Sequence, residues 1–128
     1  AIDFVVDMPD ELTNYSIPKL TLQPIVENAI LHGILEKPEK SGTIIITGWE
    51  EGDDIVIIVS DDGIGMDEET MSSILTKRPL GKTKGSNVAI YNTHQRLVIL
   101  CGKEYGLTYK SAPLEGTEVT IRIPILIG

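Results

Sequence analysis

The spacing of hydrophobic positions changes several times along this chain, and each spacing predicts a different kind of element. Residues 2–8 alternate weakly between polar and apolar, which predicts a strand. From Leu20 to His32 the apolar residues recur at helical spacing, which predicts an amphipathic helix. Its apolar stripe consists of Leu22, Ile25, Val26, Ala29 and Ile30. Thr21 can cap this helix, Pro24 is tolerable in its first turn, and Gly33 can help to end it.

The second half of the chain continues with short elements of both kinds. Two β-rich runs, Thr43–Trp49 and Asp54–Ser60, are joined by the turn-forming residues 50–53, which predicts a hairpin. The further elements that we expect are a short helix opened by Asp67, Glu68 and Glu69 and running to about Thr76, a helix from about Val88 to Cys101 stopped by Gly102, and a strand pair at Gly106–Ser111 and Glu118–Pro124. This order predicts an α+β fold, a two-layer α/β sandwich with the helices on one face of a mixed, mostly antiparallel sheet.

Composition narrows the classes of protein that fit. At 128 residues the chain suits one domain, and its formal net charge of −8 argues against nucleic-acid binding, which needs a basic surface. The single Cys101 fits a reducing compartment, and no apolar run is long enough for a membrane span, so we expect no membrane contact by this segment. The chain begins in a strand-like run without an initiator Met, which suggests a piece of a longer protein.

Asn28 is the first candidate for chemistry. It lies with Pro24, Leu31 and His32 on a stripe beside the core stripe of the first predicted helix, so it should point along one edge. An amide oxygen there is a suitable single ligand for Mg²⁺, which keeps several waters and takes further oxygens from substrate phosphates. The more ordinary interpretation of this residue alone is a solvated helix asparagine.

Asp61 is the second candidate, because it ends a predicted strand and is followed by Asp62-Gly63-Ile64-Gly65. A carboxylate there can accept a hydrogen bond from an exocyclic amine, and the two glycines let the backbone approach a flat ring. The combination would select adenine over guanine. Asp-Gly is equally ordinary turn chemistry, so this segment alone leaves both interpretations open.

The loop-like residues 77–85 reverse the acidic character of the chain, since they hold four of its eleven Lys and Arg residues. Such a cluster ahead of a helix N-terminus suits a flexible phosphate lid, with Lys82 and Lys84 at the phosphates. A solvated basic loop is the alternative. Gly116 and Thr117, at the last predicted strand, supply a free backbone and a hydroxyl, which by themselves indicate little.

Together and in this order, these segments resemble the GHKL (Bergerat-fold) ATPase superfamily, and most closely the catalytic domains of LytS-type sensor histidine kinases. Residues 22–33, with Glu-Asn-Ala at their centre, resemble the N box, and residues 61–66 resemble the G1 box Asp-x-Gly-x-Gly. Residues 85–97 align with the G2 box and the helix after it through Gly85, Asn92, Arg96 and Leu97. Residues 116–119 resemble the Gly-Thr strand that closes the pocket, so the likeness covers nearly the whole chain.

The resemblance implies an ATP-binding catalytic domain with ATP and Mg²⁺ as cofactors. It implies that Asn28 ligates Mg²⁺, that Asp61 reads the adenine amino group and that Thr117 supports Asp61. Gly63 and Gly65 would line the adenine, and Gly85 would be the hinge of the lid. The full set of expected nucleotide-binding residues is Asn28, His32, Asp61, Gly63, Gly65, Met66, Lys82, Lys84, Gly85 and Thr117.

The resemblance also implies partners and a setting. Residues 1–128 would be one domain, cut from a longer membrane sensor of a two-component system and lying in the cytoplasm. The γ-phosphoryl of ATP would pass to a histidine on a separate dimerisation domain of the same parent protein, and then to a response regulator. No catalytic residue is expected within the chain itself, and the isolated domain should show little turnover.

Three features depart from the family's pattern. Leu31 stands where many members carry a Lys or Arg that meets phosphate, unless His32 or the lid lysines replace that charge. Asn87 and Ala89 stand where glycine is usual in the G2 box, which predicts a stiffer lid or a poorer approach to phosphate. Pro24 occupies the position where ATP-hydrolysing relatives carry a water-activating Glu, which favours transfer to a nucleophile other than water.

These departures leave a second hypothesis open, in which the chain is a nucleotide-binding or interaction module that has lost catalysis. A third, a chaperone- or MutL-type ATPase, is weakened by Pro24 and by the short length. His94, within the predicted helix after the lid, we interpret as structural and not as a phosphoryl acceptor.

Overall fold

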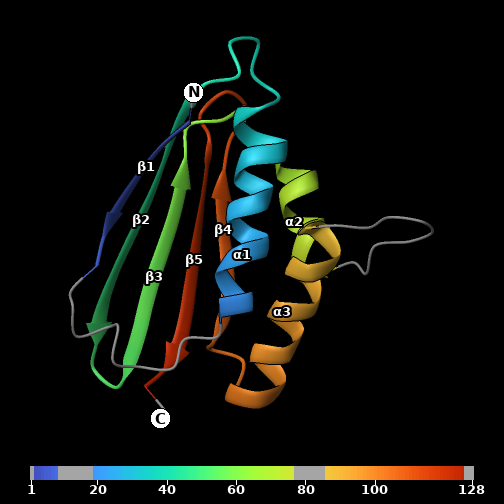
Figure 1. Ribbon diagram of the computed structural model, residues 1–128. Coiled ribbons are helices and arrows are strands. Elements are labelled where there is room, and N and C mark those ends of the chain that lie inside the picture. The colour runs from blue at the N-terminus through green and yellow to red at the C-terminus, as the bar shows by residue number, and fades with distance from the viewer. Residues whose placement is uncertain (1, 9–18, 77–85, 126–128) are drawn as a thin grey trace.

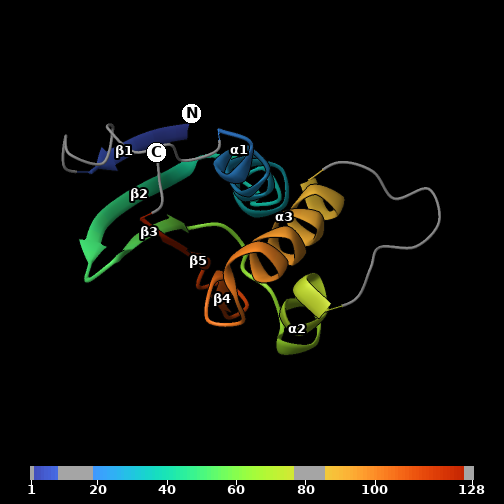
Figure 2. The ribbon, with the colours of Figure 1, turned by 90° about the horizontal axis from the view of Figure 1, so that it is seen from below.

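The computed structural model describes residues 2–8, 19–76 and 86–125, and these form two layers (Figures 1 and 2). The elements are β1 (Ile2–Asp7), α1 (Lys19–Asn28), η2 (Ala29–Ile34), β2 (Gly42–Glu51), β3 (Asp54–Asp61), α2 (Glu68–Thr76), α3 (Ser86–Cys101), β4 (Gly106–Ser111) and β5 (Thr117–Pro124). All helices lie on one face of a single sheet, so the predicted α+β sandwich is confirmed. None of the helices in these described parts has the length and apolar character that a membrane crossing requires.

The sheet has the strand order β1-β2-β3-β5-β4. β1 pairs with β2 in parallel, and every other neighbouring pair is antiparallel, as the sequence predicted. The helical connection through α1 and η2 allows β1 and β2 to pair in parallel, whereas a turn joins the antiparallel β2 and β3 and a loop joins β4 and β5. The central strand β3 and its neighbour β5 carry most of the buried side chains of the sheet.

Alternate side chains of the sheet face the helices and form the hydrophobic core. On β3, Ile55, Ile57 and Val59 are each 1% exposed or less. The residues that meet them include Ile44, Val119, Ile121 and Ile123 from the sheet, and Ile25, Ala29, Ile34, Ile90 and Leu97 from the helices. Burying each such large aliphatic side chain contributes about 1.5–3 kcal/mol, so this interface is the main source of stability.

The first helix is longer than the sequence predicted and changes its winding. After Asn28 the chain continues as the π-helical turn η2, in which the Leu35 N–H donates to the Ile30 carbonyl over 2.9 Å. Gly33 was expected to help end this helix, and that expectation is wrong, because the helix runs on through Ile34. Gly33 is instead buried within the turn, and π turns of this kind are frequent at functional sites.

Local signals elsewhere place the ends of elements close to the predicted positions. Glu51 pairs with Asp54 across a two-residue turn, and Gly52 has the positive φ of 61° that such turns need. Asp67 caps α2 by accepting a 2.7 Å hydrogen bond from the Thr70 N–H. The end of the sheet where β3 begins is tied by Asp54, which accepts from Tyr105 Oη at 2.8 Å and from Arg122 Nε at 2.9 Å.

His94 joins α3 to β4, as the structural interpretation predicted. Its Nδ1 accepts a 3.0 Å hydrogen bond from the Leu107 N–H, which requires a neutral ring with that nitrogen unprotonated. Burial lowers the pKa of His94 below its ordinary value of 6.5. A bulkier residue at Gly106 would crowd this contact, since a Cβ there would lie 2.8 Å from Nδ1.

We predict that this histidine makes stability depend on pH in a defined direction. Because its pKa is lower in the folded chain, the unfolded chain takes up the proton first as pH falls below about 6.5. The free energy of unfolding should therefore fall with decreasing pH in that range and recover as pH rises. The variant His94→Gln, which can still accept from Leu107 but does not titrate, should lose this part of the dependence. Urea unfolding between pH 5 and 7.5 tests it, and parallel pH profiles of the two proteins would contradict it.

Candidate functional site

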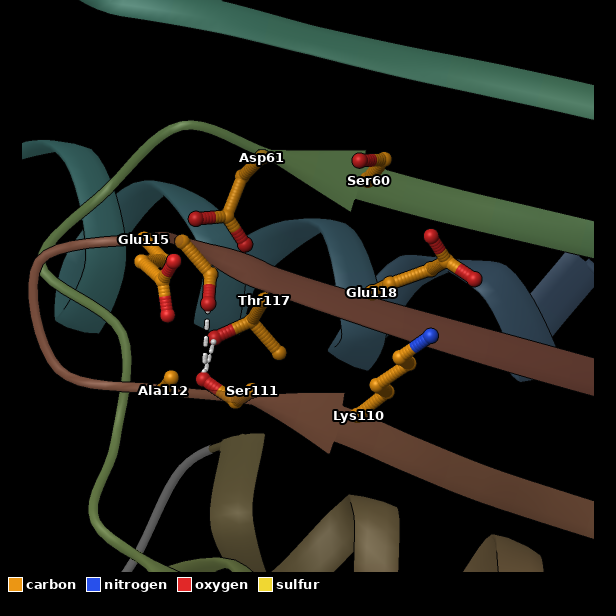
Figure 3. Close-up of a pocket in the computed structure, with 9 residues that line it drawn as sticks. Ser60, Asp61, Lys110, Ser111, Ala112, Glu115, Thr117 and Glu118 are labelled. Carbon is orange, nitrogen blue, oxygen red and sulfur yellow. Dashed lines mark hydrogen bonds between the residues drawn. The ribbon is translucent and has the colours of Figure 1, made fainter.

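Three polar residues lie in one row across the ends of three neighbouring strands. Asp61 of β3 is the register partner of Thr117 of β5, and Thr117 is the partner of Ser111 of β4. Their side chains share the helix-facing side of the sheet with the core residues two positions away along each strand. Figure 3 shows the three of them together at the mouth of a pocket. The antiparallel register thus brings together residues far apart in the sequence.

Ser111 connects this row to the loop that follows Asp61. Its Oγ accepts a 2.9 Å hydrogen bond from the Met66 N–H and donates a 2.7 Å bond to the Gly116 carbonyl. The Ser111 and Thr117 hydroxyl oxygens lie 2.9 Å apart, also at hydrogen-bond distance (Figure 3). One hydroxyl therefore fixes β4, the start of β5 and the loop of residues 62–66 relative to one another.

The Asp61 carboxyl group is buried, with 8% of the residue exposed. Burial raises the pKa of Asp61 above its ordinary value, and the nearby Asp62 charge acts in the same direction. Hydrogen bonds from the Gly63 and Thr117 backbone N–H groups oppose this rise, and the Gly63 bond to Oδ1 is 2.8 Å long. The result is a largely dehydrated acceptor held in place by the backbone, which suits recognition of a hydrogen-bond donor.

The backbone of η2 comes into direct contact with the loop after Asp61. A Cβ at Gly63 would lie 2.3 Å from the Gly33 carbonyl carbon, and a Cβ at Gly33 would lie 2.9 Å from Asp61 Oδ1. The Ile64 N–H donates to the Gly33 carbonyl over 3.2 Å. Only residues without a side chain permit this approach, so Gly33 and Gly63 place the helix end against the carboxylate.

Two further glycines shape the loops around the row. Gly65 has a φ of 71°, and a Cβ there would overlap the Ala112 carbonyl oxygen. Gly116 has a φ of 83°, and a Cβ there would overlap the carbonyl oxygen of Asp61. Both positions combine positive φ with a close backbone approach, so substitution would displace the loops that carry Asp61 and Thr117.

Asn28 is not the solvated residue that the helix pattern allowed. It is 9% exposed at the junction of α1 and η2, and Pro24 on the same stripe is buried as well. Leu31 and His32, from the same predicted stripe, are exposed, Leu31 by 49%. The stripe is divided because the π turn changes the direction in which side chains project after Asn28. A buried amide at the junction of α1 and η2 is consistent with a polar binding site there.

The structure thus brings some of the predicted nucleotide-binding residues together, but not all of them. Asp61, Gly63, Gly65, Met66 and Thr117 meet at the strand ends, and the contact with Gly33 brings the helix that carries Asn28 alongside. His32 is exposed on η2, while Lys82, Lys84 and Gly85 lie outside the described residues. The sequence did not reveal Gly33 or Ser111 as site residues. Gly33 lies next to His32 in the N box, whereas no spacing rule pointed to Ser111.

The pocket in Figure 3 has a volume of about 290 Å³ and wraps around the strand ends. Asp61, Ser111 and Thr117 contribute from the helix side, whereas Ser60, Lys110 and Glu118 alternate with them along the strands and belong to the open face. The wall where the row lies therefore presents the Asp61 carboxylate beside two hydroxyl groups, which can each donate and accept. A ligand bound against this wall must present hydrogen-bond donors to Asp61.

A helix ending on a glycine-lined loop, beside a buried carboxylate at the end of a sheet strand, brings together the segments in which the sequence resembles the GHKL ATPases. The chain belongs to the family of histidine kinase-, DNA gyrase B- and HSP90-like ATPases, whose family model matches residues 16–127. It is a histidine-kinase-type catalytic domain of that family, as the resemblance of its motifs predicted.

Individual relatives agree with this assignment. The sensor protein LytS of Oceanobacillus iheyensis is 35% identical over 93% of this chain, and the sensor histidine kinase YesM of Bacillus subtilis is 34% identical over 96%. In both cases the chain spans about a fifth of the relative's length, 20%. The histidine kinase domain of a blue-light activated kinase from Erythrobacter litoralis has the same fold, with a TM-score of 0.63 at 19% identity over 98% of this chain and 52% of that one.

We predict that Asp61 lowers the stability of the nucleotide-free domain. The pKa of Asp61 is raised above 3.8 in the folded chain, so below that pH the buried carboxyl group is neutral. As pH rises through the folded pKa, the group becomes charged and the free energy of unfolding falls. Asp61→Asn keeps an oxygen for the Gly63 N–H and removes the buried charge, at the loss of the weaker contribution from the Thr117 N–H. At neutral pH, without nucleotide, the variant should melt a few degrees higher than the wild-type chain. The difference should disappear near pH 3.8, and a lower melting temperature at neutral pH would contradict the prediction.

Proposed function

We propose that this domain binds Mg²⁺-ATP between η2, the loop of residues 62–66 and the ends of β4 and β5, and donates the γ-phosphoryl group to a histidine on a separate dimerisation domain of its parent protein. A response regulator would then receive the phosphoryl group. The observation that carries the proposal is the buried Asp61 carboxylate, fixed by backbone hydrogen bonds in a recess that only glycines allow.

Recognition of the base follows from the chemistry of that recess. An ionised carboxylate only accepts hydrogen bonds, so Asp61 matches the exocyclic amine of adenine and repels the carbonyl oxygen that guanine carries there. On the sequence pattern, Gly63 and Gly65 would line the flat ring, and both lack the Cβ that would collide with the backbone of Gly33 or Ala112. The support that we expected from Thr117 for Asp61 is available through the backbone N–H, because the Thr117 hydroxyl lies at Ser111.

Asn28 fits the proposed metal role through its burial and its position. Its amide is a polar group within the protein at the end of α1, five residues before the glycine that touches Asp61. Bound Mg²⁺ would neutralise charge on the transferring phosphates. On the sequence pattern, His32, Lys82 and Lys84 would add positive charge at the phosphates, and Gly85 would let the lid move.

The phosphoryl acceptor would lie outside this chain. Pro24 occupies the N-box position of the hydrolytic Glu and is buried, so no carboxylate at that position activates water. His94 is occupied by the Leu107 N–H. We infer that the domain forms part of a membrane-anchored sensor and works on the cytoplasmic side, where ATP is available. Its family relatives favour this kinase function over a module that has lost catalysis.

The metal role predicts how Asn28 variants bind ATP. Asn28→Ala removes the amide ligand, so Mg²⁺ should no longer strengthen ATP binding, and the affinity in Mg²⁺ should fall by about tenfold or more. Asn28→Asp keeps an oxygen ligand at the same place and should retain the Mg²⁺ dependence. Calorimetric titrations with ATP, with and without Mg²⁺, check this, with thermal unfolding as the control for folding. Equal Mg²⁺ dependence in Asn28→Ala and the wild-type chain would refute the role.

If the acceptor histidine lies on another domain, the isolated chain should bind ATP without turning it over. The isolated chain should bind Mg²⁺-ATP and release phosphate no faster than a slow background. Adding the dimerisation domain of the parent kinase should produce acid-labile phosphorylation on that domain and not on His32 or His94. Phosphate release and the acid stability of the phosphoprotein, measured in both samples, decide the matter. Rapid release by the isolated chain would instead indicate an ATPase.

A further inference from the structure

We propose that Ser111 is a positioning residue that sets the direction of the Thr117 hydroxyl, and through it the selectivity of the pocket for an amino group at position 6 of the purine. The inference rests on the proposed adenine site and adds a residue that contacts no ligand itself. It comes from the hydrogen bonds around one hydroxyl oxygen, Ser111 Oγ, at the edge of the row Asp61-Thr117-Ser111 (Figure 3).

A serine hydroxyl can donate one hydrogen bond and accept two. Ser111 Oγ has three neighbours, which are the Met66 N–H at 2.9 Å, the Gly116 carbonyl at 2.7 Å and Thr117 Oγ1 at 2.9 Å. The Met66 N–H can only donate and the Gly116 carbonyl can only accept. The single Ser111 proton therefore goes to Gly116, and the remaining lone pair of Ser111 accepts from Thr117.

The opposite arrangement would leave a buried group without this partner. If the Ser111 proton pointed to Thr117, the Gly116 carbonyl would lose its 2.7 Å bond, and Gly116 is buried. A buried carbonyl left without its hydrogen bond carries its full desolvation penalty, which is enough to decide between two hydroxyl orientations. The Thr117 proton is therefore directed at Ser111, and Thr117 Oγ1 offers only lone pairs toward the pocket.

This orientation gives the wall of the pocket two adjacent acceptors. Asp61 and Thr117 are direct register partners on antiparallel strands, so their side chains lie side by side on the same face. The exocyclic amine of adenine carries two N–H donors, one for each acceptor. A 6-oxo purine presents only an acceptor at that position and meets two acceptors. Without Ser111, the Thr117 hydroxyl could rotate and donate to the oxo group, which would weaken this discrimination.

The test compares binding of ATP with binding of inosine triphosphate, in which an oxo group replaces the 6-amino group. The measured quantity is the dissociation constant of inosine triphosphate divided by that of ATP, in the full chain with Mg²⁺. Ser111→Ala should lower this ratio by about three- to tenfold, the effect of one hydrogen bond. Ser111→Thr keeps the hydroxyl and should restore the wild-type ratio. Ser73→Ala serves as the matched control, because Ser73 donates a comparable 2.9 Å bond to the Thr70 carbonyl on the surface of α2.

Two outcomes separate the inference from a general loss of structure. If Ser111→Ala weakens both nucleotides equally and leaves the ratio unchanged, Ser111 only supports the loops and the inference is wrong. If Ser111→Ala does not fold, Thr117→Val provides the test, because removing the second acceptor should lower the same ratio by a similar factor. An unchanged ratio in Thr117→Val would also overturn it. Failure of the wild-type chain to bind ATP would instead refute the proposed function, which this design detects first.

Discussion

The close approach of two backbones, at Gly33 and Gly63, is the constraint on which the site depends. Without side chains at these positions, the end of the helical layer rests directly on the loop that leaves β3, and the Ile64 N–H bonds to the Gly33 carbonyl. The contact holds the Asp61 carboxylate against the helix and excludes water from one of its sides. A methyl group at either glycine would force the two layers apart at this point, because packed interiors cannot absorb such an overlap.

A buried carboxylate is costly, and the structure shows how that cost is limited. Burial raises the pKa of Asp61, while two backbone N–H groups stabilise its charged form. This buried carboxyl group lies at the end of the sheet where β3 ends. At the other end, Asp54 is paired with Arg122 and Tyr105, and α3 is tied to β4 through His94. One end of the sheet is therefore held together by the bonds of Asp54 and His94, which maintain the fold. At the other end the polar groups around Asp61 are held in place for a ligand.

The departures from the family's pattern take on different meanings in three dimensions. Leu31 is half exposed on η2, so this neutral side chain lies at the surface and outside the core. Pro24 is buried in α1, where it forms part of the packed helix. The row of Asp61, Thr117 and Ser111 is held by hydrogen bonds to Gly63, Met66 and Gly116, which lie in other segments than Pro24 and Leu31. The proposed base-recognition residues therefore belong to other elements than the two positions that depart from the family's pattern.

The sequence by itself determined the elements, the mixed sheet and the position of Asp61 at a strand end. These follow from short-range patterns, such as the alternation before Asp61 and the acidic cap at Asp67, which act within a few residues. Tertiary structure decided the burial of Asn28, the role of Gly33 and the involvement of Ser111. Each of these depends on groups from distant parts of the chain, which the register of β3, β5 and β4 and the π turn bring together. No local pattern contains that information, because hydrogen-bond partners and close contacts are set only when the layers pack.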